Sequence, residues 1–141
     1  MAVQRIEDPA ELAAAFALRE LVFCREQGVD LAAERDGRDG DAVHLGATDD
    51  GDLIGTCRLL AYDGALLVQR VAVRREHRRH GVGAALLGAA AAFAAAAGYR
   101  ELALDAQVVS REFYERQGYR AEGEPFLEEG IEHIAMRRAV R

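Results

Sequence analysis

Apolar and polar positions in the N-terminal part of the chain predict one strand, one helix and one long loop. Residues 3–6 are expected to form a short opening strand. Asp8 followed by Pro9 predicts a helix start, because aspartate caps free amides and proline is favoured in the first turn. The helix is expected to reach Cys24 or Arg25. Its buried face should include Leu12, Phe16, Leu21 and Phe23.

The polar segment 26–41 is rich in glycine and aspartate and is expected to be a loop. Three apolar runs follow it and predict strands over residues 42–48, 53–62 and 65–73. Turn-forming residues separate these runs, and the last two are joined by an Asp-Gly pair. Since Asp-Gly between apolar runs is a strong hairpin signal, the three strands should form an antiparallel meander.

The C-terminal half alternates between helices and strands. An alanine-rich helix should begin at Gly81 and end at Gly98, where a glycine is a natural C-cap. The remaining elements are expected at residues 101–106 (strand), 110–117 (helix), 119–122 and 133–140 (strands). The strand–helix–strand crossover should be parallel and right-handed. These elements predict an α/β (α+β) fold in one domain over residues 1–141, with a mixed sheet.

Composition narrows the possible function classes. A net charge of −6 argues against a nucleic-acid partner. The chain has no lysine, which excludes a Schiff-base lysine, a Walker phosphate loop and a kinase-type ATP lysine. The two cysteines form no metal or disulfide pattern, so reduced thiols in a cytoplasmic protein are expected. Residues 81–99 are uncharged but mostly small, so we expect no membrane partner.

The segment RRHGVGAAL at residues 78–86 carries the sharpest chemical signal. Two glycines at a helix start allow a ligand to approach the backbone, and the free amides favour an anion such as a phosphate. The alternative is a glycine-containing helix start with a solvated basic run. A dinucleotide-binding fingerprint does not fit, because the glycines do not follow the strand directly and Leu86 replaces the third glycine.

Together with its surroundings, this segment resembles the GNAT superfamily of acyl-CoA-dependent N-acetyltransferases. RRHGVG at residues 78–83 matches the family signature R/Q-x-x-G-x-G/A and follows a strand that ends at Val73. FYERQGY at residues 113–119 is close to the family's FYEKLGF. Further motifs are similar to the small bacterial ElaA/YjcF-like branch: VF with EQ at 22–27, DAVH at 41–44, and GEPF through GIEHI at 123–134.

The resemblance implies splayed central strands and a site for acetyl-CoA, with no metal. Backbone amides of the glycine loop would hold the pyrophosphate, and the strand ending at Val73 would pair with the pantetheine. An amide of that strand would also polarise the thioester carbonyl. The residues that the resemblance assigns to acetyl-CoA are Val71, Val73, Arg78, Arg79, His80, Gly81, Val82, Gly83 and Ala84. Tyr114 matches the tyrosine near the CoA sulfur and would act as general acid.

The general base is not assigned by the resemblance. Glu26 and His44 are the first candidates, each with the alternative of a purely structural role. Arg58, inside an apolar strand, would bind an acceptor carboxylate or, as we favour, a buried partner acid. The acids of the long loop would either attract a cationic amine or simply be solvated; they are Glu34, Asp36, Asp39 and Asp41.

The sequence therefore predicts an N-acetyltransferase that moves an acetyl group from acetyl-CoA to a primary amine of a small molecule or peptide. The alternatives are a non-catalytic acyl-CoA-binding or sensing module, and a relative of the acyl-homoserine-lactone synthases. A monomer or a homodimer is expected. His77 and His80 stand beside arginines that would repel a cation, so no metal site is expected.

Overall fold

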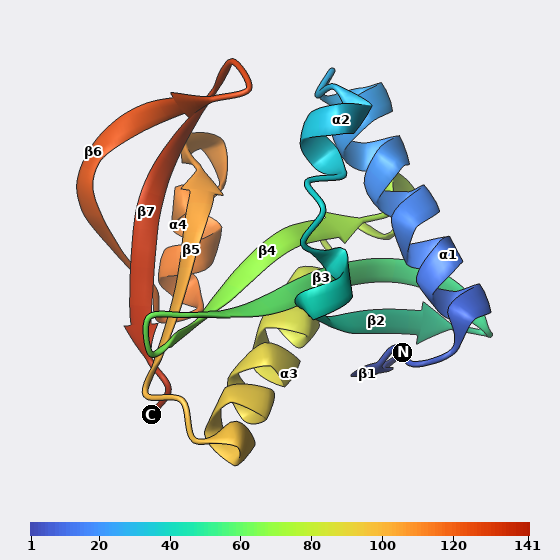
Figure 1. The fold of residues 1–141 in the computed structure, drawn as a ribbon, viewed down its shortest axis with the longest axis horizontal. Coiled ribbons are helices and arrows are strands. Elements are labelled where there is room, and N and C mark those ends of the chain that lie inside the picture. Colours follow the sequence, from blue (N-terminus) through green and yellow to red (C-terminus); the bar gives the residue numbers. More distant parts are fainter.

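Seven strands form one continuous sheet in the computed structural model, which describes residues 1–141 (Figure 1). The sheet order is β1-β2-β3-β4-β5-β7-β6. The strands are β1 (Ala2–Arg5), β2 (Val43–Asp49), β3 (Asp52–Tyr62), β4 (Ala65–Val73), β5 (Glu101–Gln107), β6 (Arg120–Glu128) and β7 (Ile131–Ala139). The α-helices are α1 (Pro9–Arg19), α2 (Leu31–Glu34), α3 (Val82–Ala97) and α4 (Arg111–Arg116). All strand pairs are antiparallel except β4 and β5.

Tight hairpins build the antiparallel part of the sheet. At the turn between β2 and β3, Asp50 and Gly51 have φ of 49° and 82°, and at the turn between β3 and β4, Asp63 and Gly64 have φ of 50° and 82°. Two consecutive positive φ values give the turn twist that two-residue hairpins need. The meander predicted from the Asp-Gly signal is therefore confirmed.

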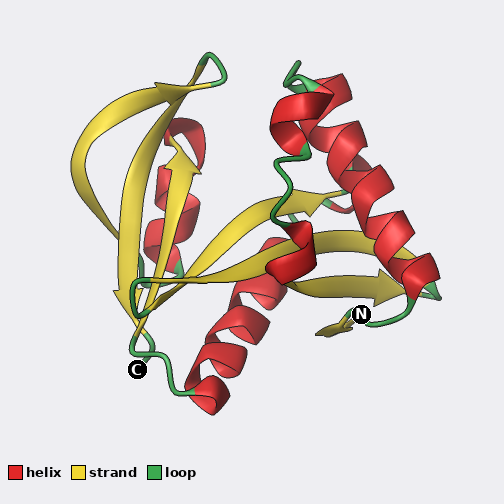
Figure 2. Cartoon of the chain, in the orientation of Figure 1, coloured by secondary structure: helices red, strands yellow, loops and turns green.

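The parallel crossover runs from β4 through α3 to β5. Both ends of α3 carry a glycine in the left-handed conformation, Gly81 at the start and Gly98 at the end. β4 and β5 pair only from Ala65 to Leu67, after which the two strands diverge (Figure 2). The predicted mixed sheet with splayed central strands is confirmed.

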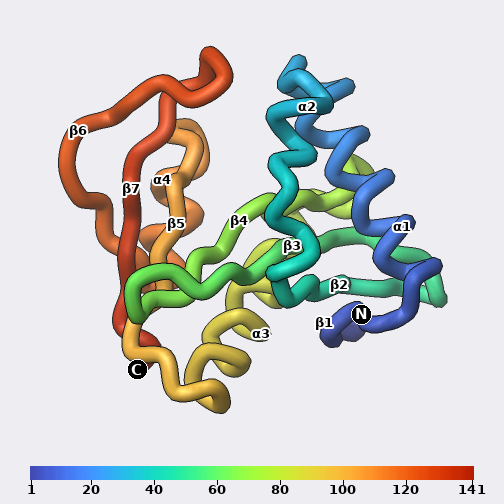
Figure 3. The backbone as a smooth tube through the Cα atoms, viewed as in Figure 1, coloured from blue at the N-terminus to red at the C-terminus, as the bar shows by residue number.

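Helices cover both faces of the sheet. On β2, Leu45 packs in the larger apolar cluster, which includes α3, whereas the missing Cβ of the next residue, Gly46, faces Ile6 and Leu53 of the cluster that includes α1. Because adjacent residues of a strand point to opposite faces, α1 and α3 lie on opposite faces (Figure 3). α3 approaches closely at Gly55, where an added Cβ would lie 2.7 Å from Cγ1 of Val82.

Three local predictions are corrected by the structure. The N-terminal helix widens to π-helical geometry over Glu20–Glu26, and this change of period leaves Leu21 exposed. The predicted loop 26–41 contains α2, which is held by ion pairs that a local pattern does not reveal. The strand predicted over residues 119–122 continues to Glu128, since a bulge between Glu122 and Phe126 accommodates Pro125 within β6.

Candidate active site

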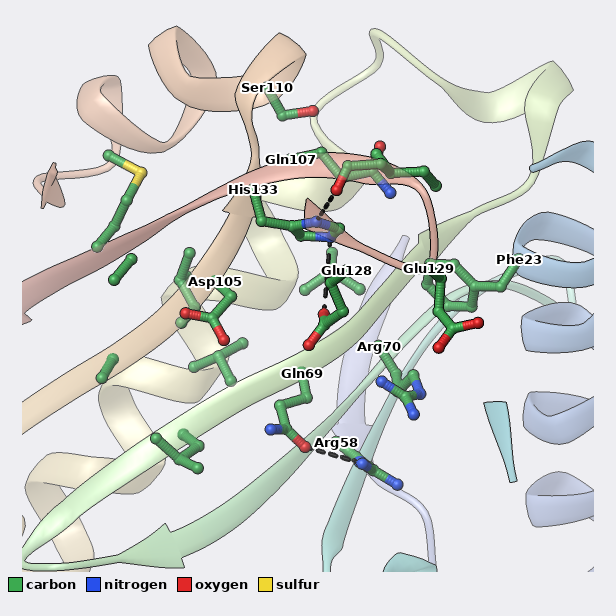
Figure 4. A pocket seen from close by; sticks show the side chains of 18 of the residues that line it. Phe23, Arg58, Gln69, Arg70, Asp105, Gln107, Ser110, Glu128, Glu129 and His133 are labelled. Carbon is green, nitrogen blue, oxygen red and sulfur yellow. Dashed lines mark hydrogen bonds and ion pairs between the residues drawn. The ribbon is translucent and has the colours of Figure 1, made fainter. Parts of the chain in front are cut away.

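A cavity of about 730 Å³ opens where β4 and β5 diverge, on the sheet face opposite α3. On β5, Leu102, Leu104 and Ala106 belong to the α3 core, so the alternating neighbours Asp105 and Gln107 project into the cavity. β7 contributes Ile131, His133 and Ala135 in the same alternation, and β4 contributes Leu67, Gln69 and Val71. Figure 4 shows Asp105, Gln107 and His133 around this space.

The open edge of β4 carries unpaired peptide groups. The N–H of Arg74 donates to the carbonyl of Ile54 on β3, at 2.8 Å. Because consecutive peptide N–H groups on a strand point in opposite directions, the N–H groups of Val71 and Val73 face away from β3. They face the side from which β5 has diverged, since β5 pairs with β4 no further than Leu67.

A β-bulge shapes the same stretch of β4. Thr56 on β3 lies opposite Ala72, whereas Arg58 lies opposite Gln69, so one residue of β3 faces two residues of β4. At this bulge Arg70 has φ of 56°, which is unusual for a residue with a Cβ. Gln69 and Arg70 both line the cavity as a result.

The glycine loop presents free amides at the start of α3. The first hydrogen bond of the helix runs from the N–H of Ala85 to the carbonyl of Gly81, at 3.0 Å. The N–H groups of Val82, Gly83 and Ala84 come before it and have no partner within the helix. No side chain caps this end and no acid lies in the first turn. Free amides at the positive end of a helix dipole are able to bind an anion.

Two features of the loop depend on glycine. Gly81 has φ of 83°, a conformation that glycine adopts at no steric cost. No atom lies within 4 Å of its missing Cβ, so the space beside it is open to a ligand. At Gly83 an added Cβ would lie 3.1 Å from Cζ of Phe113, so its role is to let α4 pack against α3.

Arg78 connects the glycine loop to β4 and to the end of the N-terminal helical segment. Its Nε donates to the carbonyl of Val73 at 2.9 Å, and its Nη2 donates to Oε1 of Glu26 at 2.7 Å. Glu26 is thus a partner of the loop and is not among the residues that line the cavity. Arg79 and His80 are exposed beside it.

Tyr114 lines the cavity from α4. Burial raises the pKa of its hydroxyl to about 12, and the buried thiol of Cys57 acts in the same direction. The ring packs edge-on against Phe113 and Tyr119, with centroids 5.1 and 6.0 Å away. The phenol is therefore protonated at every working pH and is held in place by its aromatic neighbours.

His44 is buried outside the cavity. Its Nε2 lies 3.0 Å from the carbonyl oxygen of Asp39, and its ring packs edge-on against Phe16. The structure thus brings Tyr114 to the cavity. Glu26 lies at the glycine loop instead, and His44 lies against Phe16 and the backbone of Asp39.

A network of ion pairs holds the acids of the long loop. Arg58 pairs with Asp36 at 2.6 Å and with Asp39 at 3.1 Å, so the predicted pairing with acids is confirmed, although these two carboxylates are partly exposed and only Arg58 is buried. Arg19 pairs with Glu34 at 2.7 Å, and Arg70 reaches the same carboxylate at 3.0 Å. These carboxylates are neutralised within the protein, and only Asp41 of the four loop acids lies outside the network.

Several polar residues of the cavity were not singled out by the sequence. Nδ1 of His133 lies 2.7 Å from the carbonyl oxygen of Ile131, and its Nε2 lies 3.8 Å from Oε2 of Glu128. Gln107 donates to Gln27 at 2.8 Å, a contact that joins β5 to the segment after the N-terminal helix. The alternation of β7 could have signalled His133, because its neighbours Ile131 and Ala135 share its face.

Neither a metal centre nor a membrane span is part of this arrangement. No three His, Cys, Asp or Glu side chains come together in a group that could hold a metal ion. No helix combines the length and the apolar character that crossing a bilayer would require.

Comparison with known proteins agrees with the fold and the motifs. The family of acetyltransferase (GNAT) domains matches residues 14–140. The N-acetyltransferase YjcF of Bacillus subtilis is 35% identical over 127 residues, covering 89% of this chain and 91% of that protein.

Two solved structures are similar over their whole length. An acyl-CoA N-acyltransferase from Pseudomonas aeruginosa has a TM-score of 0.88 and 33% identity, covering 99% of this chain and 100% of that one. ElaA of Escherichia coli has a TM-score of 0.87 and 26% identity, covering 97% and 98% of the two chains. The chain therefore belongs to the GNAT acetyltransferase family, within its small bacterial ElaA/YjcF-like branch.

Proposed function

We propose that the protein transfers an acetyl group from acetyl-CoA directly to a primary amine of a small molecule or peptide. One relationship carries the proposal: the open edge of β4 runs from the anion site at Gly81 to the cavity that contains Tyr114. A donor lying along this edge would have its phosphates at the helix start and its thioester at the cavity. Membership of the acetyltransferase family supports the reaction class.

The donor site in this proposal consists of backbone groups and arginine. The amides from Arg79 to Ala84 would bind the pyrophosphate, with the side chains of Arg78, Arg79 and His80 beside it. The N–H groups on the open edge of β4, at Val71 and Val73, would pair with the amide groups of pantetheine. No lysine takes part, because the chain has none.

The chemistry follows from where charge develops. As the amine nitrogen forms its bond to the carbonyl carbon, the carbonyl oxygen gains negative charge, and the N–H of Val71 or Val73 would stabilise it. The carbon–sulfur bond then breaks, and Tyr114 donates its proton to the departing thiolate. The raised pKa of Tyr114, about 12, keeps this proton available. The tyrosinate regains a proton from the amide nitrogen.

The acceptor must lose a proton before it attacks, since an alkylammonium has a pKa near ~10.4. Glu26 and His44, the first candidates for the base, lie outside the cavity lining, so either would reach the ammonium only through water. The proposed setting is one domain, monomeric or dimeric, in the cytoplasm, where thiols such as Cys24 and Cys57 stay free.

The test is acetyl-CoA turnover with free-thiol detection across a panel of amines. Each cationic amine is paired with a zwitterion of similar size: putrescine with γ-aminobutyrate, and tryptamine with tryptophan. A lysine-containing peptide completes the panel. The proposal expects at least one amine to release thiol well above the rate of hydrolysis. Binding of acetyl-CoA without release by any amine would instead establish a non-catalytic acyl-CoA-binding module.

A further inference from the structure

Resting on the acyl transfer proposed above, we propose that His133 is the general base that takes the proton from a cationic acceptor amine, with Glu128 as its positioning residue. His133 lies near the start of β7, where Gln107 of β5 and Phe126 of β6 are its register partners. Its ring is buried, lines the cavity and stacks on Phe126 with centroids 6.0 Å apart. The ring orientation is therefore fixed toward the space that an acceptor would fill (Figure 4).

The tautomer of His133 follows from its partners. A backbone carbonyl oxygen only accepts hydrogen bonds, so the contact with Ile131 at 2.7 Å requires the proton on Nδ1. In the neutral ring Nε2 then carries the lone pair. The nearby Oε2 of Glu128, 3.8 Å away, is an acceptor and lies beyond hydrogen-bond distance, so it does not engage that lone pair.

Glu128 is placed to pair with the ring once the ring carries the proton of the amine. Once Nε2 accepts a proton, an imidazolium lies beside the carboxylate, and a small approach of the two side chains makes a charge-assisted hydrogen bond. The position of Glu128 is determined by the hairpin, where Glu129 and Gly130 have φ of 51° and 75° and Glu128 pairs with Ile131.

Charge around the ring favours a cationic acceptor. The cavity carboxylates without an arginine partner are Asp105, Glu128 and Glu129, from β5 and the β6–β7 hairpin. On the α2 side, Arg58 and Arg70 are paired with Glu34 and Asp36, which leaves Arg38 as the cavity arginine without an acid partner. Arg137 pairs with Glu101 and Glu122. The unpaired charge that faces His133 is thus mainly negative and attracts an ammonium group.

The proton count balances. The ammonium gives one proton to Nε2 of His133 and becomes a neutral amine. Its nitrogen forms the C–N bond while the C–S bond breaks, and the second proton passes from nitrogen to the thiolate through Tyr114. The products are the acetylated amine and the free thiol, and the imidazolium returns its proton to water. Neither an oxidant nor a metal is required.

The test is the pH profile of kcat/KM for His133→Asn with each amine that the wild type acetylates. Asparagine retains a donor for the carbonyl of Ile131 but has no lone pair at the Nε2 position. We expect kcat to fall by ~10²–10⁴-fold, with the acidic limb of the profile lost. Glu128→Gln should lower kcat, because the carboxylate that would pair with the imidazolium during the reaction is gone. Glu132→Gln, on the opposite face of β7, should leave both kcat and the pH profile unchanged.

Two further measurements distinguish a failure of the inference about His133 from a failure of the proposed function. Thermal unfolding and acetyl-CoA affinity should match the wild type in His133→Asn, which shows that the fold and the donor site are intact. Full turnover by this variant, or a preference for zwitterionic acceptors over cationic ones, would overturn the inference and leave the proposed function standing. Absence of amine-dependent thiol release from the wild type would overturn both.

Discussion

Arg19 and Glu34 form an ion pair inside the protein, with 2.7 Å between Nη2 and Oε2 and only 1% of each side chain exposed. The pair joins α1 to α2, and the same guanidinium reaches Asp39 at 2.7 Å. Since Arg70 of the β4 bulge also binds Glu34, this network connects both helices to the strand whose open edge we assign to the donor. The wall of the cavity is thus fixed by charge as well as by apolar packing.

Removing one member of this network should be costly. Arg19→Met leaves the carboxylate of Glu34 buried with fewer donors, and we expect the free energy of unfolding to fall by ~3–5 kcal/mol. Urea unfolding measures it. The matched control is Arg111→Met, which removes an exposed pair with Glu115 and should cost about 0.3–0.5 kcal/mol. Equal losses in the two variants would show that the buried network is not special.

The same network should make the free energy of unfolding depend on pH. A side-chain hydrogen bond from Arg58 holds the pKa of Asp36 well below its usual range, helped by the backbone N–H of Arg38 and the charges of Arg58 and Arg70. A lowered pKa in the folded state means that this stabilisation is complete above about pH 5 and is lost as pH falls. Asp36→Asn should therefore lose less stability than the wild type between about pH 5 and pH 3, in urea unfolding at each pH. A steeper loss in the variant would contradict this.

The donor site can be tested at Gly81. Aspartate there would add a negative charge beside the free amides of α3, so Gly81→Asp should weaken acetyl-CoA binding by at least ~10-fold in calorimetric titration. Gly88→Asp makes the same change at an exposed position further along α3, where nothing lies within 4 Å of the added Cβ. Affinity that falls equally in both variants, or in neither, would argue against the site.

Two neighbouring tyrosines give a controlled test of the acid. Tyr114→Phe should lower kcat by ~10²–10⁴-fold, because the departing thiolate loses its proton donor. Tyr119 is buried and its hydroxyl has no hydrogen-bond partner, so Tyr119→Phe should keep turnover and raise the unfolding free energy by about 1 kcal/mol. Unchanged turnover in Tyr114→Phe would remove the acid role.

Local signals were sufficient for most of the fold. The Asp-Gly pairs predicted the meander because two-residue hairpins need positive φ, and the glycines at 81 and 98 marked both ends of α3 for the same reason. The period change at Glu20 and the ordering of Leu31–Glu34 were not predicted. Both depend on tertiary contacts, above all on the pairs that Arg19 makes with residues distant in sequence.

The parts of the candidate site that the sequence predicted are those formed by residues close together in the chain. The uncapped helix start at Gly81, where we propose the phosphates bind, depends on backbone conformation, and a short motif predicts it. The cavity depends on which strands diverge and which side chains share a face, so the sequence did not bring Asp105, Gln107 and His133 together, although the alternation of β7 could have signalled His133. Glu26 was a candidate base in the sequence, but the structure pairs it with Arg78, which lies far along the chain and which no local pattern identifies as its partner.

The most direct test of the account follows an isotopically labelled acetyl group from acetyl-CoA under rapid-quench conditions. Mass spectrometry then measures the label on the amine and on the protein, while free thiol is measured in parallel. Direct transfer predicts labelled amide in amounts equal to the thiol, with no label on the protein at any time. Label carried by the protein before the amine is added, or thiol released without labelled amide, would contradict it.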